Sequence, residues 1–216
     1  MLTQEQLTMM AENVARIREN MAAAAREAGR DPADILLCAA CKTRTVEEVI
    51  ASAVLPIDLF GENHVQELVE KTDANAYCGK PGHFIGHLQT NKVRQVVGKV
   101  SLIQSVDSER LLAAIDREAA RQGIVQDILL EVNIGEEASK SGFAAEDILP
   151  LMEKIGEFSN ICIKGLMAIP PISHISGENQ KFFQKMFHLS VDIRQKKYDN
   201  VKAVSYTHLT LPTTER

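Results

Sequence analysis

The sequence has 216 residues, a formal net charge of −5, 45% hydrophobic residues and 25% charged residues. A mildly acidic chain does not favour nucleic acid as a partner, because phosphate backbones call for dense lysine and arginine patches. No apolar run approaches the ~18 residues of a membrane span, and the N-terminus has no basic start followed by an apolar block, so we expect a cytoplasmic protein without a membrane partner.

Residues 3–28 predict an amphipathic helix. Its first turn carries the capping-box pattern of Thr3 with Gln6, in which each side chain bonds the backbone N–H of the other residue. Apolar residues recur at helical spacing behind this cap, and Gly29 is a natural C-terminal stop.

After this helix, short apolar runs alternate with longer helical patterns. The runs occupy 35–41, 57–61, 83–88, 101–106, 127–134 and 161–169, and the helical patterns occupy roughly 46–54, 64–73, 91–98, 109–122, 145–157 and 177–196. Expected helix starts are a second capping box at Thr45 with Glu48, and N-caps at Thr90, Asp107 or Ser108, and Ser176. Successive strand–helix units with near-continuous apolar strands predict an α/β protein with a parallel sheet buried on both faces. No G-x-G-x-x-G follows the first strand, so a TIM-type (β/α) barrel fits better than a dinucleotide-binding fold.

Two cysteines of the first run, Cys38 and Cys41, form a C-x-x-C pattern that suggests zinc or redox chemistry. On a strand, residues three apart point to opposite faces, so they would not share one metal ion. We therefore expect core cysteines. His83 and His87 also suggest a metal, but on a strand they would lie about 13 Å apart, and we expect no metal site.

Each apolar run ends in polar or reactive residues. Lys42, Glu62 with Asn63, His87 with Gln89, Ser105 with Asp107, Asn133, and the region of Met167 follow the runs in chain order. In a barrel of parallel strands these ends meet at one rim, where barrel active sites lie. The sequence therefore predicts a small-molecule site at this rim.

Lys42 is the most informative of these residues. Seven apolar residues precede it, so its stem is expected in the core and its amine at the rim, where partial desolvation lowers the pKa of an ammonium group. Arg44 would push the pKa the same way if the strand continues. A neutral amine can form a Schiff base with an aldehyde, whereas the alternative is a snorkelling lysine without chemistry. Likewise, Met167 is either a packing residue or the flank of a flat ring, and Lys140 either reaches the rim or is a solvated loop charge.

The segments CKTRTVEEV, LFGENHVQEL, HFIGHLQTNKV, SLIQSVDS, LLEVNIGEEASKSGF and IKGLMAIPP resemble the pyridoxal phosphate homeostasis protein family, which is related to the N-terminal barrel of alanine racemases. The resemblance covers roughly residues 1–200. It implies a (β/α)8 barrel of pyridoxal phosphate fold type III.

The resemblance also implies the residues of a cofactor site. Lys42 would carry pyridoxal 5′-phosphate as an internal aldimine, and Asn63 would lie beside the cofactor. Ser105, Asn133 and Met167 would line the pocket around the ring, and Lys140 matches a loop lysine near the cofactor. Family members are thought to bind and deliver the cofactor to apo-enzymes rather than to catalyse efficiently, and the complete protein would be a monomer.

The C-terminal residues depart from the family pattern. The family continues with an S-x-G-M-S segment and an R-x-G-x-x-I-F-G segment that bind the phosphate, and neither has a match in residues 203–216. VKAVSY is expected to begin a seventh strand. We therefore expect a barrel domain over 1–202 with about six to seven strands, lacking its last βα units, and an aberrant tail over 203–216. A truncated barrel of this kind would bind the cofactor weakly or be poorly soluble.

Three functions are compatible with these residues. The first is a cofactor carrier that keeps pyridoxal phosphate in balance. The second is an amino-acid racemase, which needs an acid–base group across the ring from Lys42, commonly a tyrosine; Tyr77, Tyr198 and Tyr206 do not follow a strand clearly. The third is a Schiff-base aldolase that uses no cofactor. The G-E-N and G-H-L-Q motifs favour the cofactor.

Overall fold

The computed structural model of the protein describes residues 2–137, 140–173, 175, 177–196, 198 and 201. These residues fall into two compact units. The first comprises Met1–Gly86 with Lys99–Ser101, and the second comprises His87–Gly98 with Leu102–Arg216. The expected cap Ser176, most of the VKAVSY segment and the tail 203–216 lie outside the described residues.

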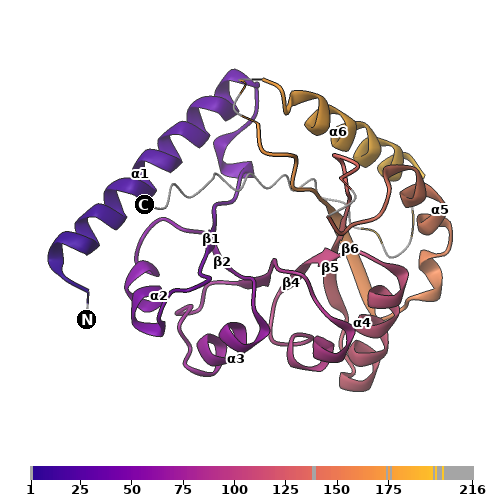
Figure 1. The fold of residues 1–216 in the computed structure, drawn as a ribbon, viewed down its shortest axis with the longest axis horizontal. Coiled ribbons are helices and arrows are strands. Elements are labelled where there is room, and N and C mark those ends of the chain that lie inside the picture. The colour runs from indigo at the N-terminus through magenta and orange to yellow at the C-terminus, as the bar shows by residue number, and fades with distance from the viewer. Residues whose placement is uncertain are drawn as a thin grey trace. The chain divides into compact units, whose positions relative to one another are not determined.

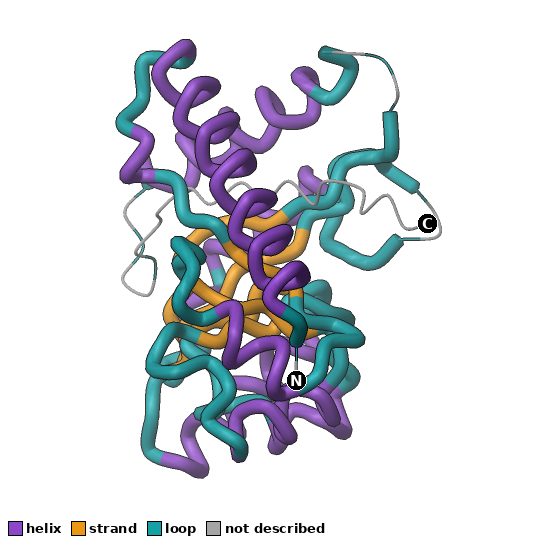
Figure 2. The backbone as a smooth tube through the Cα atoms, turned by 90° about the vertical axis from the view of Figure 1, so that its left-hand side faces the viewer, coloured by secondary structure: helices purple, strands orange, loops and turns teal. Residues whose placement is uncertain are grey.

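Three parallel strands form the sheet of the first unit. Its elements are α1 (Gln4–Glu27), the 3-10 helix η1 (Pro32–Asp34), β1 (Cys38–Ala40), α2 (Val46–Ser52), β2 (Leu59–Glu62), α3 (Val65–Asp73) and β3 (Gly82–Phe84). β2 pairs in parallel with β1 through Ala39 and Phe60, and with β3 through Gly61 and His83. Figure 1 shows α2 after β1 and α3 after β2, and Figure 2 shows α1 as a long purple helix.

Both capping boxes predicted from the sequence are present. Thr3 and Gln6 cap each other at the start of α1, and Thr45 and Glu48 do so at the start of α2. Gly29 has a φ of +68°, and its N–H donates to Arg26 O, so the predicted stop after the first helix is also confirmed. A left-handed residue suits glycine because it carries no Cβ.

Three further parallel strands form the sheet of the second unit. Its elements are the 3-10 helix η2 (Thr90–Gln95), β4 (Leu102–Val106), α4 (Glu109–Gln122), β5 (Gln126–Glu131), the 3-10 helix η3 (Ala145–Asp147), α5 (Ile148–Glu153), the 3-10 helix η4 (Ile155–Glu157), β6 (Ile161–Met167) and α6 (Gln180–Gln195). β5 lies between β4 and β6 and pairs in parallel with both. Val201 adds an isolated parallel bridge to Ile163, at the start of the segment expected to begin another strand.

The predicted burial is confirmed for β2, β4, β5 and β6 but is wrong for β1, where Cys38 and Ala39 are half-buried and Ala40 is exposed. Every residue of β2 and β4 is buried, and β5 and β6 expose none of their residues fully. Such strands suit a parallel sheet that is covered on both faces. No helix among the described residues is both long and apolar enough to cross a membrane.

One expected helix start is wrong. Thr90 does not cap an α-helix over 91–98: a 3-10 helix begins at Thr90 itself, its N-cap is Gln89, and no side chain caps it. The segment contains Val93, Val96 and Val97, and β-branched side chains disfavour a helix because they lose rotamer freedom. Ser108, in contrast, accepts from Leu111 N–H and caps α4 as predicted.

Candidate functional site

Lys42 lies in a turn directly after β1, at the carboxyl end of that strand. Its side chain is exposed, so the expectation of a stem buried in the core is wrong. The strand ends at Ala40, and the chain turns back because Arg44 N–H donates to Cys41 O at 3.0 Å. Arg44 therefore does not continue a strand beside Lys42; its guanidinium lies 3.8 Å from the Glu48 carboxylate.

The residue after Lys42 has a strained backbone. Thr43 has a φ of +63°, a left-handed conformation that is an outlier for a β-branched side chain. Such a conformation costs on the order of 1–3 kcal/mol and persists only where the surroundings hold it. Its N–H donates to Glu67 Oε2 on α3 at 2.9 Å, which is one such restraint.

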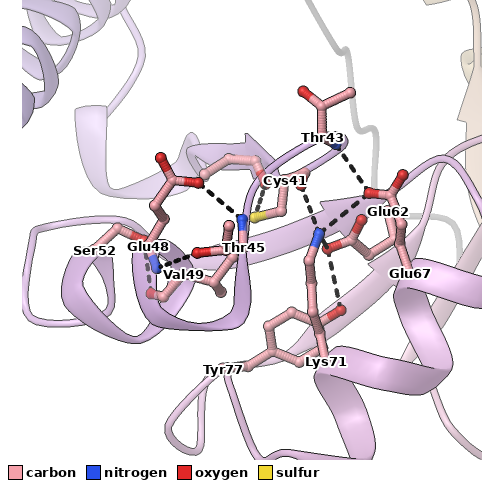
Figure 3. Close-up of polar contacts among 11 residues, drawn as sticks. Cys41, Thr43, Thr45, Glu48, Val49, Ser52, Glu62, Glu67, Lys71 and Tyr77 are labelled. Carbon is pink, nitrogen blue, oxygen red and sulfur yellow. Dashed lines mark hydrogen bonds and ion pairs between the residues drawn. The ribbon is translucent and has the colours of Figure 1, made fainter. Parts of the chain in front are cut away.

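A buried lysine lies beneath this turn. Lys71 on α3 is only 1% exposed, and its ammonium group donates to Cys41 O at 2.6 Å, Glu62 Oε1 at 2.9 Å and Glu67 Oε2 at 3.3 Å (Figure 3). An ammonium group has three N–H donors, and these three acceptors use all of them. Lys71 is therefore not available as a nucleophile in this structure.

Lys42 differs from Lys71 in this respect. Within the part of the chain that the structure describes, Lys42 Nζ makes neither a hydrogen bond nor an ion pair. Its amine therefore remains exposed, at the end of a parallel strand where the sequence predicts a small-molecule site.

Glu62 ends β2 and completes the buried cluster. The side chain is fully buried; Oε1 accepts from Lys71 and, at 3.4 Å, from Tyr77 Oη (Figure 3). Its other oxygen, Oε2, has no hydrogen-bond partner among the described residues. Burial raises the pKa of the Glu62 carboxyl, although the hydrogen bond and the charge of Lys71 pull it down. Burial and the Glu62 charge also raise the pKa of Tyr77.

The two cysteines of the C-x-x-C pattern have weakly acidic thiols. Burial, and then the charge of Glu62, raises the pKa of Cys38 to about 12 and that of Cys41 to about 12. Cys41 is buried and Cys38 is half-buried, and both are free thiols. A metal site or a reactive thiol needs a thiolate, so this environment favours the inert core cysteines that the sequence predicted.

Asn63 follows Glu62 and is half-buried. Its backbone is packed directly against Gly86, the glycine of the G-H-L-Q motif: a Cβ built on Gly86 would lie 2.1 Å from Asn63 O and 2.6 Å from Asn63 Cα. These atoms are backbone and cannot swing away. Gly86 thus fixes the backbone of Asn63 through close packing, which requires a residue without a side chain.

We expect Gly86→Ala to destabilise the protein by about 3 kcal/mol, because the added methyl group would push the Asn63 backbone aside. Urea unfolding of both proteins measures this loss. Gly156→Ala is the matched control, since a Cβ at Gly156 meets nothing within 4 Å, and its stability should match that of the parent. Equal stability of the Gly86 variant and the parent would contradict the close packing.

In the second unit, Asn133 and Lys140 organise one loop after β5. Asn133 Nδ2 donates to Glu137 O at 2.9 Å and to Lys140 O at 3.4 Å, while its Oδ1 accepts from Glu137 N at 3.2 Å. Lys140 pairs with the Glu137 carboxylate and donates to Ile169 O at 3.4 Å. The amide of Asn133 thus shapes the loop that carries Lys140.

The other two predicted residues of this unit are buried at strands. Ser105 lies within β4 and is 2% exposed, and Met167 ends β6 and is 3% exposed. Met167 packs in a core cluster with Leu102 and Leu129. The packing interpretation of Met167 is thus the one that its described contacts support.

The second unit also holds a polar cluster of His87, Asp107 and Ser141 that was not predicted from the sequence. His87 Nδ1 lies 3.1 Å from Asp107 Oδ2 and 3.5 Å from Ser141 Oγ. Burial, followed by the charge of Asp107, raises the pKa of Glu131. His87 is exposed, and its pairing partner is a carboxylate and not His83, which belongs to the first unit. The positions of both residues at run ends were the available signal.

Comparison with known proteins identifies the relatives of this chain. A family profile described as the N-terminal domain of alanine racemase matches residues 13–210. The pyridoxal phosphate homeostasis protein of Aquifex aeolicus (strain VF5) is 36% identical over 200 residues, which are 93% of this chain and 86% of the relative.

Two solved structures are similar over nearly the whole chain. A protein from Bifidobacterium adolescentis has 29% identity and a TM-score of 0.89, and the match covers 96% of this chain and 88% of that one. PipY of Synechococcus elongatus PCC7942, solved with PLP bound, has 24% identity and a TM-score of 0.76, with 92% and 88% covered. These matches confirm the predicted class, the α/β barrel of fold type III. The chain belongs to the alanine racemase N-terminal domain family and, within it, to the pyridoxal phosphate homeostasis proteins.

Proposed function

We propose that this protein binds pyridoxal 5′-phosphate through Lys42 and acts as a carrier and buffer that keeps the cofactor in balance. The observation that carries the proposal is the contrast between two lysines of the first unit. Lys42 presents an exposed amine at the end of β1, whereas Lys71 has every N–H donor in use. Relatives are named for pyridoxal phosphate homeostasis, and PipY has been solved with PLP bound.

The residues of the first unit fit this cofactor. Pyridoxal phosphate supplies an aldehyde, whose carbon forms a carbon–nitrogen bond with a primary amine while its oxygen leaves as water. Lys42 offers such an amine, and the neighbouring thiol of Cys41 is held protonated by its raised pKa and does not compete strongly. Asn63, fixed by Gly86, is the proposed neighbour of the cofactor.

The resemblance also assigns Ser105, Asn133, Lys140 and Met167 to the cofactor. Ser105 and Met167 are buried at strands, and Asn133 holds the loop of Lys140 in place through its amide. We propose that Asn133 acts through this loop rather than through a free amide. Lys140 is paired with Glu137 and would have to exchange that partner for an anionic ligand.

A racemase is the second candidate, because the chain shares the fold of alanine racemases. It requires an acid–base group opposite Lys42. Tyr77 is a poor choice because it is buried, hydrogen-bonded to Glu62 and has a raised pKa. Tyr206 lies outside the described residues. A Schiff-base aldolase that uses Lys42 alone remains the third candidate.

The proposal also includes a cytoplasmic location, a monomeric state for the complete protein and transfer of the cofactor to apo-enzymes. The last two points rest on what the resemblance to the family implies. Transfer would require that the bond to Lys42 be reversible, which is a property of the condensation of an amine with an aldehyde.

One experiment separates the three candidates. The purified protein is mixed with pyridoxal phosphate, reduced with borohydride, digested and analysed by mass spectrometry, and alanine racemization is measured on the same preparation. We expect a phosphopyridoxyl group on the Lys42 peptide and no racemization. Racemization with the group on Lys42 would favour the racemase, and an unlabelled Lys42 would overturn the proposal.

A further inference from the structure

The two residues that flank Lys42 are tied to one pair of side chains on α3. Cys41, the residue before it, accepts a hydrogen bond from Lys71 through its carbonyl oxygen at 2.6 Å. Thr43, the residue after it, donates its N–H to Glu67 Oε2 at 2.9 Å. Lys71 and Glu67 are themselves paired at 3.3 Å and stand one helical turn apart (Figure 3).

We propose that Lys71 and Glu67 form a clamp that positions the turn bearing Lys42, so that both are positioning residues for attachment of pyridoxal phosphate. This inference rests on the proposed function. The clamp closes a continuous path from Cys41 O through the Lys71 ammonium and the Glu67 carboxylate to the Thr43 N–H. The clamp therefore bonds the residues on both sides of Lys42 but not Lys42 itself.

The direction of Lys42 depends on its backbone. Among the described residues no contact restrains its amine, so the conformation of the turn alone sets where the side chain starts. The left-handed Thr43 is part of that conformation, with a φ of +63°. Without the Glu67 acceptor, the Thr43 N–H would lose the hydrogen bond that helps to hold this strained φ, and relaxation of Thr43 would rotate the peptide that follows Lys42.

A hydrogen bond to Glu62 holds the Lys71 end of the clamp in place. Lys71 is buried, and its remaining N–H donates to Glu62 Oε1, at the end of β2. The position of the ammonium group is therefore fixed by a strand, while its other two bonds reach the turn and Glu67. The end of β2 thus helps to fix the position of the turn that follows β1. This matters because small errors in the placement of a reacting group can lower a reaction rate by orders of magnitude.

The test is a series at Glu67, which is only half-buried and can be changed at modest cost to stability. Glu67→Ala removes the acceptor of Thr43 and Lys71, whereas Glu67→Gln keeps one carbonyl acceptor. At saturating pyridoxal phosphate, stopped-flow absorbance measures the rate at which Lys42 reacts. We expect Glu67→Ala to slow the reaction by about tenfold and Glu67→Gln to restore part of the rate.

Two controls separate positioning from general loss of stability. Leu68→Ala opens a cavity on the same helix but removes no hydrogen bond of the clamp, because Leu68 is fully buried and apolar, and its reaction rate should match the parent while the protein remains folded. Lys99→Met removes an exposed pair with Asp73 at 2.8 Å and should also leave the rate unchanged. Circular dichroism of each apoprotein verifies that it is folded.

The outcomes are distinct. If the parent protein acquires the pyridoxyl group on Lys42 and the Glu67 variants react at the parental rate, the clamp is wrong while the proposed function stands. If Leu68→Ala slows the reaction as much as Glu67→Ala, a general loss of rigidity explains the slower rate and the clamp is wrong. If Lys42 of the parent protein stays unlabelled, both proposals fall. A Lys71→Met variant that folds provides a second member of the series and should react slowly as well.

Discussion

Replacing Lys42 with alanine is expected to abolish the covalent attachment of pyridoxal phosphate completely. Lys71, the buried lysine bonded to this turn, offers no substitute, because it uses each of its donors for Cys41, Glu62 and Glu67. Borohydride reduction followed by intact-mass measurement should show no pyridoxyl mass on Lys42→Ala. The change itself should alter the free energy of unfolding by less than about 0.5 kcal/mol, because the side chain is exposed.

Lys140→Ala is the matched control for this prediction. It removes another lysine that the resemblance places near the cofactor, one paired with Glu137, so its loss should weaken binding without preventing the bond to Lys42. A pyridoxyl mass that persists on Lys42→Ala, mapped to any other lysine, would move the attachment point and refute the assignment.

Replacing Lys71 with methionine is expected to destabilise the protein by about 3–5 kcal/mol, the usual cost of leaving a buried charge without its partner. Glu62 is the group left behind: it is fully buried, and its Oε2 already has no hydrogen-bond partner among the described residues. The free energy of unfolding from urea titration measures the loss. A decrease below about 1 kcal/mol would contradict the view that this charge is needed.

The same variant should respond to pH in a defined direction. Burial raises the pKa of Glu62 in the folded protein, and loss of the Lys71 cation should raise it further. A carboxyl whose folded pKa lies above its unfolded value, ~4.3, favours folding most below that value and loses this contribution as the pH rises. The loss of unfolding free energy caused by Lys71→Met should therefore become smaller as the pH falls from 7 toward about 4. Adding Glu62→Gln should recover part of the deficit at pH 7, because the buried charge is gone.

The helices and strands of the protein could largely be predicted from the sequence. Two capping boxes, the Ser108 cap and the limits of α4 follow from local side-chain chemistry, which the sequence shows directly. The six apolar runs each overlap a strand because parallel strands covered on both faces need continuous apolar residues. What failed was the extent of β1, since the carbonyl of Cys41 turns to Arg44 and Lys71 instead of continuing the ladder.

The candidate site was predictable in part. Lys42 and Asn63 do follow strands, because a change from apolar to polar residues marks a strand end. The clamp was not predicted. Lys71 looks like a solvated helix charge in the sequence, although its place on the buried side of α3 with Val65 and Leu68 was a usable signal. The strained φ of Thr43 has no local sequence cause, because it depends on Glu67, which is 24 residues away.

The protonated state of Cys41 has a consequence for selectivity. Thiolates add to aldehydes, and this sulfur sits next in the chain to the amine proposed to react. Because burial and the Glu62 charge raise its pKa to about 12, the thiol stays protonated at neutral pH. Burial beside a carboxylate therefore suppresses the reactivity of the Cys41 sulfur, so that an electrophile at this strand end reacts with the Lys42 amine instead. The same low thiolate content should protect Cys41 from oxidation by peroxide.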